Sequence, residues 1–229
     1  MGEENIHAGH RERLKTKYLE HGLDSFTDIE AIELLLFFAI PRRSTNELAH
    51  ALLSRFGSFR GVLDAELCEL ERVPGIGENA ALLLKLVTGL NERYGVSGNG
   101  KNACISSSAE AGAYLLPYFT YRREECSVLL CMDTAGRVIG CHRLAEGSPG
   151  MVGLAARELV DLALRDKAAR VILAHNHTSG VALPSRADVD ATKQIYDVLK
   201  LIEVELMDHI IVSEGDFVSM RDSGYFHRF

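Results

Sequence analysis

The sequence predicts an α/β protein in which a mixed β-sheet with flanking helices follows a small all-helical domain. Residues 10–94 show helix-like apolar spacing that is interrupted by turn residues. From Ala103 onward, short apolar strand patterns alternate with helix patterns, which is typical of a sheet with helices packed on it. A glycine-rich polar stretch, 95–102, separates the two patterns and has the composition of a linker. We therefore expect an all-helical domain at 1–96, a linker at 97–102 and an α/β domain at 103–229.

Each element is predicted from a local signal. In the helical domain, turn residues stand at Gly22, Pro41, Gly57 and Pro74-Gly75. In the α/β domain, apolar runs bounded by polar or glycine residues predict strands at Cys126–Met132, Val138–Leu144, Val171–His175, Glu205–Val212 and Phe217–Met220. Helical spacing predicts helices at Ser108–Leu115, Gly153–Arg165 and Ser185–Leu201.

Composition favours a cytoplasmic protein without membrane segments. The chain is 47% hydrophobic, but no apolar run approaches the ~18 residues that a membrane helix needs. The N-terminus is acidic and lacks the apolar core of a secretory signal. The five cysteines are scattered and form no Cys-x-x-Cys pair, as expected for reduced thiols.

The strongest chemical signal is a pair of histidines at the end of a predicted buried strand. His175 and His177 are two residues apart, so in an extended chain their side chains point to the same face. Asp188 follows a loop with turn residues, which allows its carboxylate to return to the same place. Three such ligands leave a fourth position for water, which is the arrangement of catalytic zinc sites. Ser185, three residues before Asp188, is expected to cap the next helix.

The spacing of this motif resembles that of JAMM (MPN+) metalloproteases: His-x-His, seven residues, Ser, two residues, Asp. The form His-Asn-His-x-Ser-Gly-x-x-x-Pro-Ser-x-x-Asp is similar to bacterial RadC proteins, and the likeness covers nearly the whole chain. Thr178 stands where RadC proteins usually carry proline, which affects the rigidity of the loop more than the ligands. The resemblance implies a JAMM/MPN+-like, cytidine-deaminase-like fold. It also implies a Zn²⁺-dependent metallopeptidase that acts on peptide or isopeptide bonds, with His175, His177 and Asp188 as ligands.

The resemblance also implies a catalytic glutamate ahead of the first strand of the α/β domain. Counting back from Asp133 assigns this role to Glu125, while Glu124 and Glu146 remain alternatives. Glu125 is expected to accept the proton of a metal-activated water and to pass it to the leaving amine. Ser185 is expected to donate a hydrogen bond to the developing oxyanion.

The helical domain carries a separate motif at residues 70–81, where Gly75-Ile76-Gly77 lies between two helical segments. This motif resembles a helix-hairpin-helix, which RadC proteins usually contain and which associates them with DNA. Residues 1–96, however, hold 11 Lys+Arg against 15 Asp+Glu, an acidic balance that weakens attraction to phosphates. A DNA-associated protein with weak DNA binding through this domain, and a metal centre of nuclease or structural role, is therefore the alternative reading.

The sequence also raises the question of two further sites and of the binding partners. The pair Asp208-His209 can orient a metal-binding histidine, or it can form a purely structural hydrogen-bonded pair. His142 is expected to be a structural residue at a strand edge. The expected partner is a protein or peptide substrate, no membrane partner is expected, and a homodimer stays open.

Overall fold

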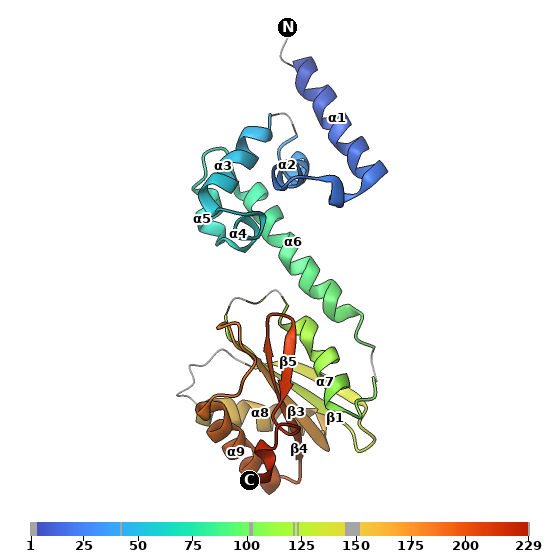
Figure 1. The fold of residues 1–229 in the computed structure, drawn as a ribbon, viewed down its shortest axis with the longest axis vertical. Helices are drawn as coiled ribbons and strands as arrows, with labels where there is room; N and C mark the ends of the chain where they lie inside the picture. The colour runs from blue at the N-terminus through green and yellow to red at the C-terminus, as the bar shows by residue number, and fades with distance from the viewer. Residues whose placement is uncertain are drawn as a thin grey trace. The chain divides into compact units, whose positions relative to one another are not determined.

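The computed structural model describes residues 4–41, 43–100, 103–120, 122, 124–144 and 152–228 (Figure 1). The chain divides into two compact units, Met1–Asn91 and Glu92–Phe229. No helix in these described ranges is long and apolar enough to span a membrane.

The first unit is helical, as predicted. Its elements are α1 (Glu4–His21), η1 (Leu23–Ser25), α2 (Asp28–Ala39), α3 (Asn46–Phe56), α4 (Phe59–Asp64), α5 (Leu67–Glu71) and the start of α6 (Glu78–Ser97). A capping box begins α2, because the Thr27 hydroxyl accepts from the Glu30 backbone N–H while the Glu30 carboxylate accepts from that of Thr27. α6 continues to Ser97, so residues 95–97 of the expected linker region are helical.

The turn between α5 and α6 is built around one glycine and one apolar anchor. Gly75 has a φ of 94°, and a Cβ at this position would lie 2.8 Å from a methyl group of Leu48. Ile76 is buried in the core of the unit, which fixes the turn against α3 and α6. Close backbone packing therefore requires the glycine at this turn.

The second unit contains a five-stranded mixed sheet of order β2-β1-β3-β4-β5, which confirms the predicted fold class. Its strands are β1 (Ser127–Met132), β2 (Val138–Arg143), β3 (Arg170–Asn176), β4 (Glu205–Ser213) and β5 (Asp216–Ser219). Only β3 and β4 run parallel, and the other neighbouring strands are antiparallel. The helices are α7 (Ser108–Leu115), α8 (Val152–Asp166) and α9 (Arg186–Leu201), with short turns η2 (Leu116–Tyr118) and η3 (Tyr225–Arg228).

Helices cover both faces of this sheet (Figure 1). Leu130, Ile172 and Ile210 belong to a core with α7 on one face. Leu129 and Leu173 belong to a second core with α8 and α9 on the other face. This two-sided burial explains the continuous apolar runs of β1 and β3 and the burial of most of β4.

One irregularity interrupts the β3–β4 pairing. Val171 lies opposite Leu206, but Ile172 lies opposite Asp208, so Met207 is an extra residue in β4. Beyond this bulge, Leu173 pairs with His209. The shift decides which side chains of β4 share a face with the end of β3.

Candidate metal centre

The two motif histidines lie at the carboxyl end of β3, on the α9 face of the sheet. His175 belongs to the strand, and His177 follows its last residue, held by a backbone hydrogen bond from its N–H to the Val212 carbonyl. Asn176 between them is buried on the opposite face. Its amide accepts from Cys126 N–H (2.8 Å) and donates to the Glu124 carbonyl (3.0 Å). Asn176 therefore fixes the segment that enters β1 against the end of β3.

The start of α9 holds the third ligand candidate. Ser185 is the N-cap, as predicted: its hydroxyl accepts from the Asp188 backbone N–H (3.2 Å). In return, the Asp188 carboxylate accepts from the Ser185 backbone N–H (2.7 Å), which completes a capping box. Gly180, with a φ of 83°, turns the preceding loop back toward the sheet. The cap thus sets the direction of the Asp188 carboxylate.

The three side chains converge. The Nε2 atoms of His175 and His177 are 2.9 Å apart, and the Asp188 carboxylate oxygens lie 3.1 and 3.2 Å from them, respectively. Each side chain is only 13–16% exposed. Ligand bonds to zinc measure about 2.0–2.2 Å, so donors this close together can share one ion after small side-chain adjustments.

The ring nitrogens that point away from this cluster have partners of their own. His177 Nδ1 contacts the Val181 carbonyl at 3.3 Å, and His175 Nδ1 contacts His209 Nε2 at 2.8 Å. A Nδ1–H that donates to such a partner leaves the Nε2 lone pair for a cation. The Val181 carbonyl therefore favours this tautomer of His177, and His209 can accept from the same tautomer of His175.

A hydrogen-bonded chain continues behind His175. His209 Nδ1 lies 2.6 Å from the Thr192 hydroxyl, which donates to the Asp188 backbone carbonyl at 2.5 Å. Burial, and next the neighbouring His175, lower the pKa of His209 well below its ordinary value, so this imidazole is neutral. A neutral His209 can accept from His175 and donate to Thr192. The chain therefore returns to the residue that supplies the carboxylate.

Each of the two roles considered for the pair Asp208-His209 therefore belongs to a different residue of the pair. His209 contacts the metal-ligand candidate His175. Asp208 lies on the opposite face of β4, where it accepts from the Ser219 hydroxyl and from the Arg221 backbone N–H. Burial raises the pKa of Asp208, although these hydrogen bonds oppose the shift. Asp208 is therefore part of the structural frame of β4 and β5.

The electrostatics of the cluster suit a cation. Burial alone would raise the pKa of Asp188, but hydrogen bonds from His175 and Ser185 outweigh it and hold the pKa well below its ordinary value. Asp188 is therefore ionised at neutral pH. Two imidazoles with one carboxylate form a ligand set found in catalytic zinc sites, so the residues present fit a divalent transition metal.

The glutamate candidates differ in their placement. Asn176 N–H donates to the Cys126 carbonyl, and continuing this antiparallel register places Glu125 opposite His177. Opposed residues of an antiparallel pair share a face, so this register, continued beyond β1, would place Glu125 on the face of the metal cluster, whereas Glu124 lies at a bend in the chain. Both are exposed, and within the described ranges no hydrogen bond or ion pair joins Glu125 to the histidines. Glu146 lies outside the described residues.

Sequence reasoning missed Asn176 and the connection from His209 to Thr192. Asn176 stands between the two histidines of the motif, and its amide could have been expected to bind backbone at a strand end. The partnership of His209 with His175 depends on strand order, which no local pattern reveals.

Two family models match this chain. The RadC-like JAB domain matches residues 105–225, and the UPF0758 N-terminal domain matches residues 7–82. The chain belongs to the RadC family. Its second unit is therefore a JAB domain of the JAMM hydrolase class, whose members generally depend on a metal, and the His175 cluster provides a suitable group of ligands. The resemblance expected from the His-x-His motif is confirmed at the level of the family.

Proposed function

We propose that this RadC protein is a zinc metallopeptidase that cleaves peptide or isopeptide bonds of a protein or peptide substrate. The observation that carries the proposal is the convergence of His175 Nε2, His177 Nε2 and the Asp188 carboxylate within 2.9–3.2 Å. The JAB domain match supports a hydrolase, and the nitrogen-rich ligand set favours zinc. Phosphodiester hydrolysis commonly uses Mg²⁺ held by carboxylates, which argues against a nuclease.

The residues around the centre divide the catalytic work. When bound, the ion polarises the scissile carbonyl and lowers the pKa of a water molecule. Glu125 accepts the proton of the attacking water and transfers it to the leaving amine. The Ser185 hydroxyl accepts from Asp188 N–H, and its own proton donates to the oxyanion that develops at the carbonyl. Within the hydrogen-bonded chain behind His175, His209 and Thr192 hold the His175 ring in place.

The proposal is tested by metal analysis of the full chain together with a peptidase assay on a proteome-derived peptide library. We expect one zinc at this centre and cleavages that a chelator abolishes and added zinc restores. Asp188→Asn should lose both the metal at this centre and the activity. Cleavages that persist unchanged in the chelator, or a library without any chelator-sensitive cleavage, contradict a metallopeptidase.

The role of Glu125 needs a separate comparison. Glu125→Gln should keep the metal but reduce turnover by about 10²–10⁴-fold, the usual contribution of a general base. Glu124→Gln is the matched control, because this exposed neighbour lies at a bend where its backbone carbonyl accepts from Asn176, and its variant should retain full activity. Unchanged turnover in Glu125→Gln would reject the base assignment and leave the metal centre to be judged from the Asp188 variant.

A further inference from the structure

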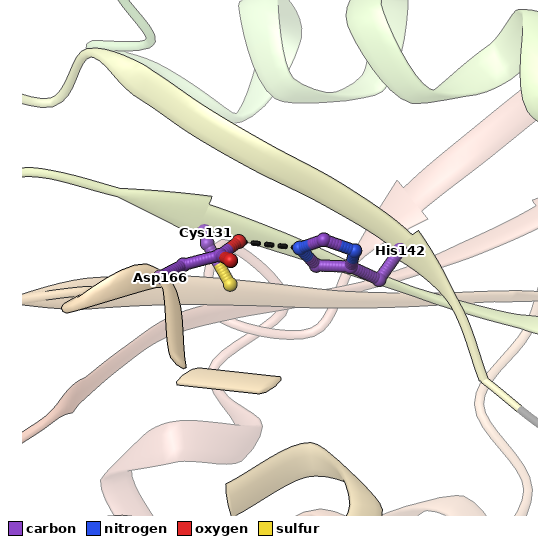
Figure 2. Close-up of side chains that lie close together, drawn as sticks. All are labelled: Cys131, His142 and Asp166. Carbon is purple, nitrogen blue, oxygen red and sulfur yellow. Dashed lines mark hydrogen bonds and ion pairs between the residues drawn. The ribbon is translucent and has the colours of Figure 1, made fainter. Parts of the chain in front are cut away.

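A second group of potential metal ligands lies outside the His175 cluster. Among the described residues, two groups of three combine His, Cys or carboxylate side chains closely enough to hold an ion. The second consists of Cys131 on β1, His142 on β2 and Asp166, the last residue of α8, and Figure 2 shows the three side chains together. One ligand atom from each lies within 4.8 Å of the others. His142 Nε2 and the Asp166 carboxylate are hydrogen-bonded to each other.

A glycine makes room for this group. Gly140 lies opposite Cys131 in the β1–β2 ladder, and it is not among the glycines with positive φ. A Cβ at Gly140 would lie 1.9 Å from an Asp166 carboxylate oxygen and 2.6 Å from His142 Nε2. The missing side chain is therefore needed for space rather than for backbone conformation. It allows a carboxylate and an imidazole to meet against the sheet.

The burial of the three side chains is graded. Cys131 is fully buried, whereas the side chains of His142 and Asp166 are 23% and 15% exposed. A cation could therefore enter from the solvent side, where His142 and Asp166 are partly exposed, and contact the Cys131 sulfur at the buried end of the group. Burial, and next the Asp166 carboxylate, raise the pKa of Cys131 to about 12, so the free thiol is not a thiolate nucleophile at neutral pH. The free thiol is therefore protonated near neutral pH, and its sulfur becomes a metal ligand only when a cation displaces this proton.

We infer that Cys131, His142 and Asp166 form a second site for a divalent cation of the zinc class, separate from the proposed catalytic centre. Sulfur, imidazole nitrogen and carboxylate oxygen are all zinc ligands, and Mg²⁺ and Ca²⁺ prefer oxygen alone. A tetrahedral zinc ion with bonds of about 2.0–2.3 Å holds its ligand atoms about 3.3–3.8 Å apart, and this group, whose ligand atoms lie within 4.8 Å of one another, can close to that spacing by side-chain movements. The sulfur–hydrogen bond of Cys131 breaks, a sulfur–metal bond forms, and the proton leaves to solvent. The bound ion joins β1, the edge strand β2 and the end of α8.

One basic side chain competes with the cation. The Arg165 guanidinium lies 3.3 Å from His142 Nδ1 and 3.7 Å from an Asp166 carboxylate oxygen. When His142 binds a metal through Nε2, its Nδ1 carries the proton and can no longer accept from Arg165. Arg165 is 64% exposed, so it can turn into solvent. Its removal should therefore strengthen metal binding.

Cobalt(II) titration of the metal-free full chain tests the inference, because a thiolate bound to cobalt gives a near-ultraviolet charge-transfer band. The His175 centre contains no thiolate and cannot produce that band. We expect two cobalt ions per wild-type chain and a thiolate band. Cys131→Ser should bind one ion without the band, while His175→Ala should also bind one ion but retain it. Cys141→Ser, a half-buried thiol on the neighbouring strand that faces the other core, is the matched control and should keep both ions.

Two further variants protect the test against misfolding. If circular dichroism shows that Cys131→Ser is misfolded, His142→Gln is used instead, because His142 is partly exposed. This variant should weaken formation of the thiolate band at least about tenfold. Arg165→Gln should increase the cobalt affinity of the second site by about two- to fivefold, because an exposed ionic contact contributes about that much. A wild-type chain without a thiolate band overturns the second site. The second site is also overturned by a thiolate band that persists in Cys131→Ser, or by one that forms in His142→Gln at unchanged cobalt affinity.

Discussion

Replacing His209 by leucine is expected to weaken zinc binding although His209 is not itself a ligand. When His175 binds a metal through Nε2, its Nδ1 carries a proton, which His209 Nε2 accepts across 2.8 Å. Leucine has no acceptor, so this N–H loses its partner at a position where residue 209 is only 2% exposed. An unpaired buried donor costs about 1–3 kcal/mol, which corresponds to about a 5- to 150-fold loss of affinity.

In the metal-bound state this N–H is fixed as a donor, so the cost is largest there. Without metal, His175 can carry its proton on Nε2, where Asp188 accepts it at 3.1 Å, and Nδ1 then needs no acceptor. The affinity is measured by competition with a chromophoric zinc chelator, and urea unfolding of the metal-free protein checks the fold. His209→Gln should recover part of the affinity, because its amide oxygen can take the place of Nε2.

Ser219→Ala provides the matched control for this prediction. It removes a hydrogen bond to Asp208 on the other face of the same strand, with no connection to His175. We expect it to lower stability but to leave zinc affinity unchanged. Wild-type affinity in His209→Leu, or an equal loss in Ser219→Ala, would refute the argument from the tautomer of His175.

The remaining predictions concern stability and DNA. The hydrogen bond from Lys17, followed by the helix cap, lowers the pKa of Glu30; a lowered pKa stabilises the fold above the unfolded value of about 4.3 and this contribution disappears as pH falls. Glu30→Gln should therefore cost about 0.5–1 kcal/mol at pH 7 and progressively less as pH falls below about 4.3, as urea unfolding can measure. Gly112→Ala should destabilise by about 1–2 kcal/mol because its Cβ would lie 2.3 Å from the Phe217 ring, whereas Gly89→Ala, with open space, should stabilise by about 0.5–1 kcal/mol; equal effects in thermal melts would contradict the packing. Duplex DNA should bind weakly and lose affinity steeply with salt, and no binding at low salt in a gel-shift assay would exclude the helical unit as a DNA contact.

The sequence predicts the part of the metal centre that depends on local geometry. His175, His177 and Asp188 lie within fourteen residues of one another in sequence. Strand alternation and a helix cap are therefore enough to bring their side chains together. These rules act between near neighbours, so they can be applied without knowing the strand order. The strands of the sheet could be predicted to within a few residues for the same reason, since each contains a local apolar pattern.

Contacts that depend on strand order could be predicted only as alternatives. The sequence offered Asp208-His209 as a pair that could orient a metal-binding histidine, but the parallel pairing of β4 with β3 decides that His209 is the residue that reaches His175. The group of Cys131, His142 and Asp166 likewise comes from three separate elements without a motif. His142 was expected to be merely structural because, taken alone, it is an isolated histidine at a strand edge. Only the three-dimensional arrangement shows its neighbours.

The extra residue Met207 in β4 has a consequence for charge. If β3 and β4 paired without the bulge, Leu173 would lie beside Asp208, and a carboxylate would stand in the row that leads to His175. The insertion exchanges that anion for the uncharged imidazole of His209. A divalent ion held by two neutral rings and one carboxylate keeps a net charge of +1, whereas a second acid beside it would cancel that charge. A single extra amino acid in β4 thereby keeps a second carboxylate away from the proposed centre, which would otherwise reduce the electron-withdrawing strength of an ion bound there.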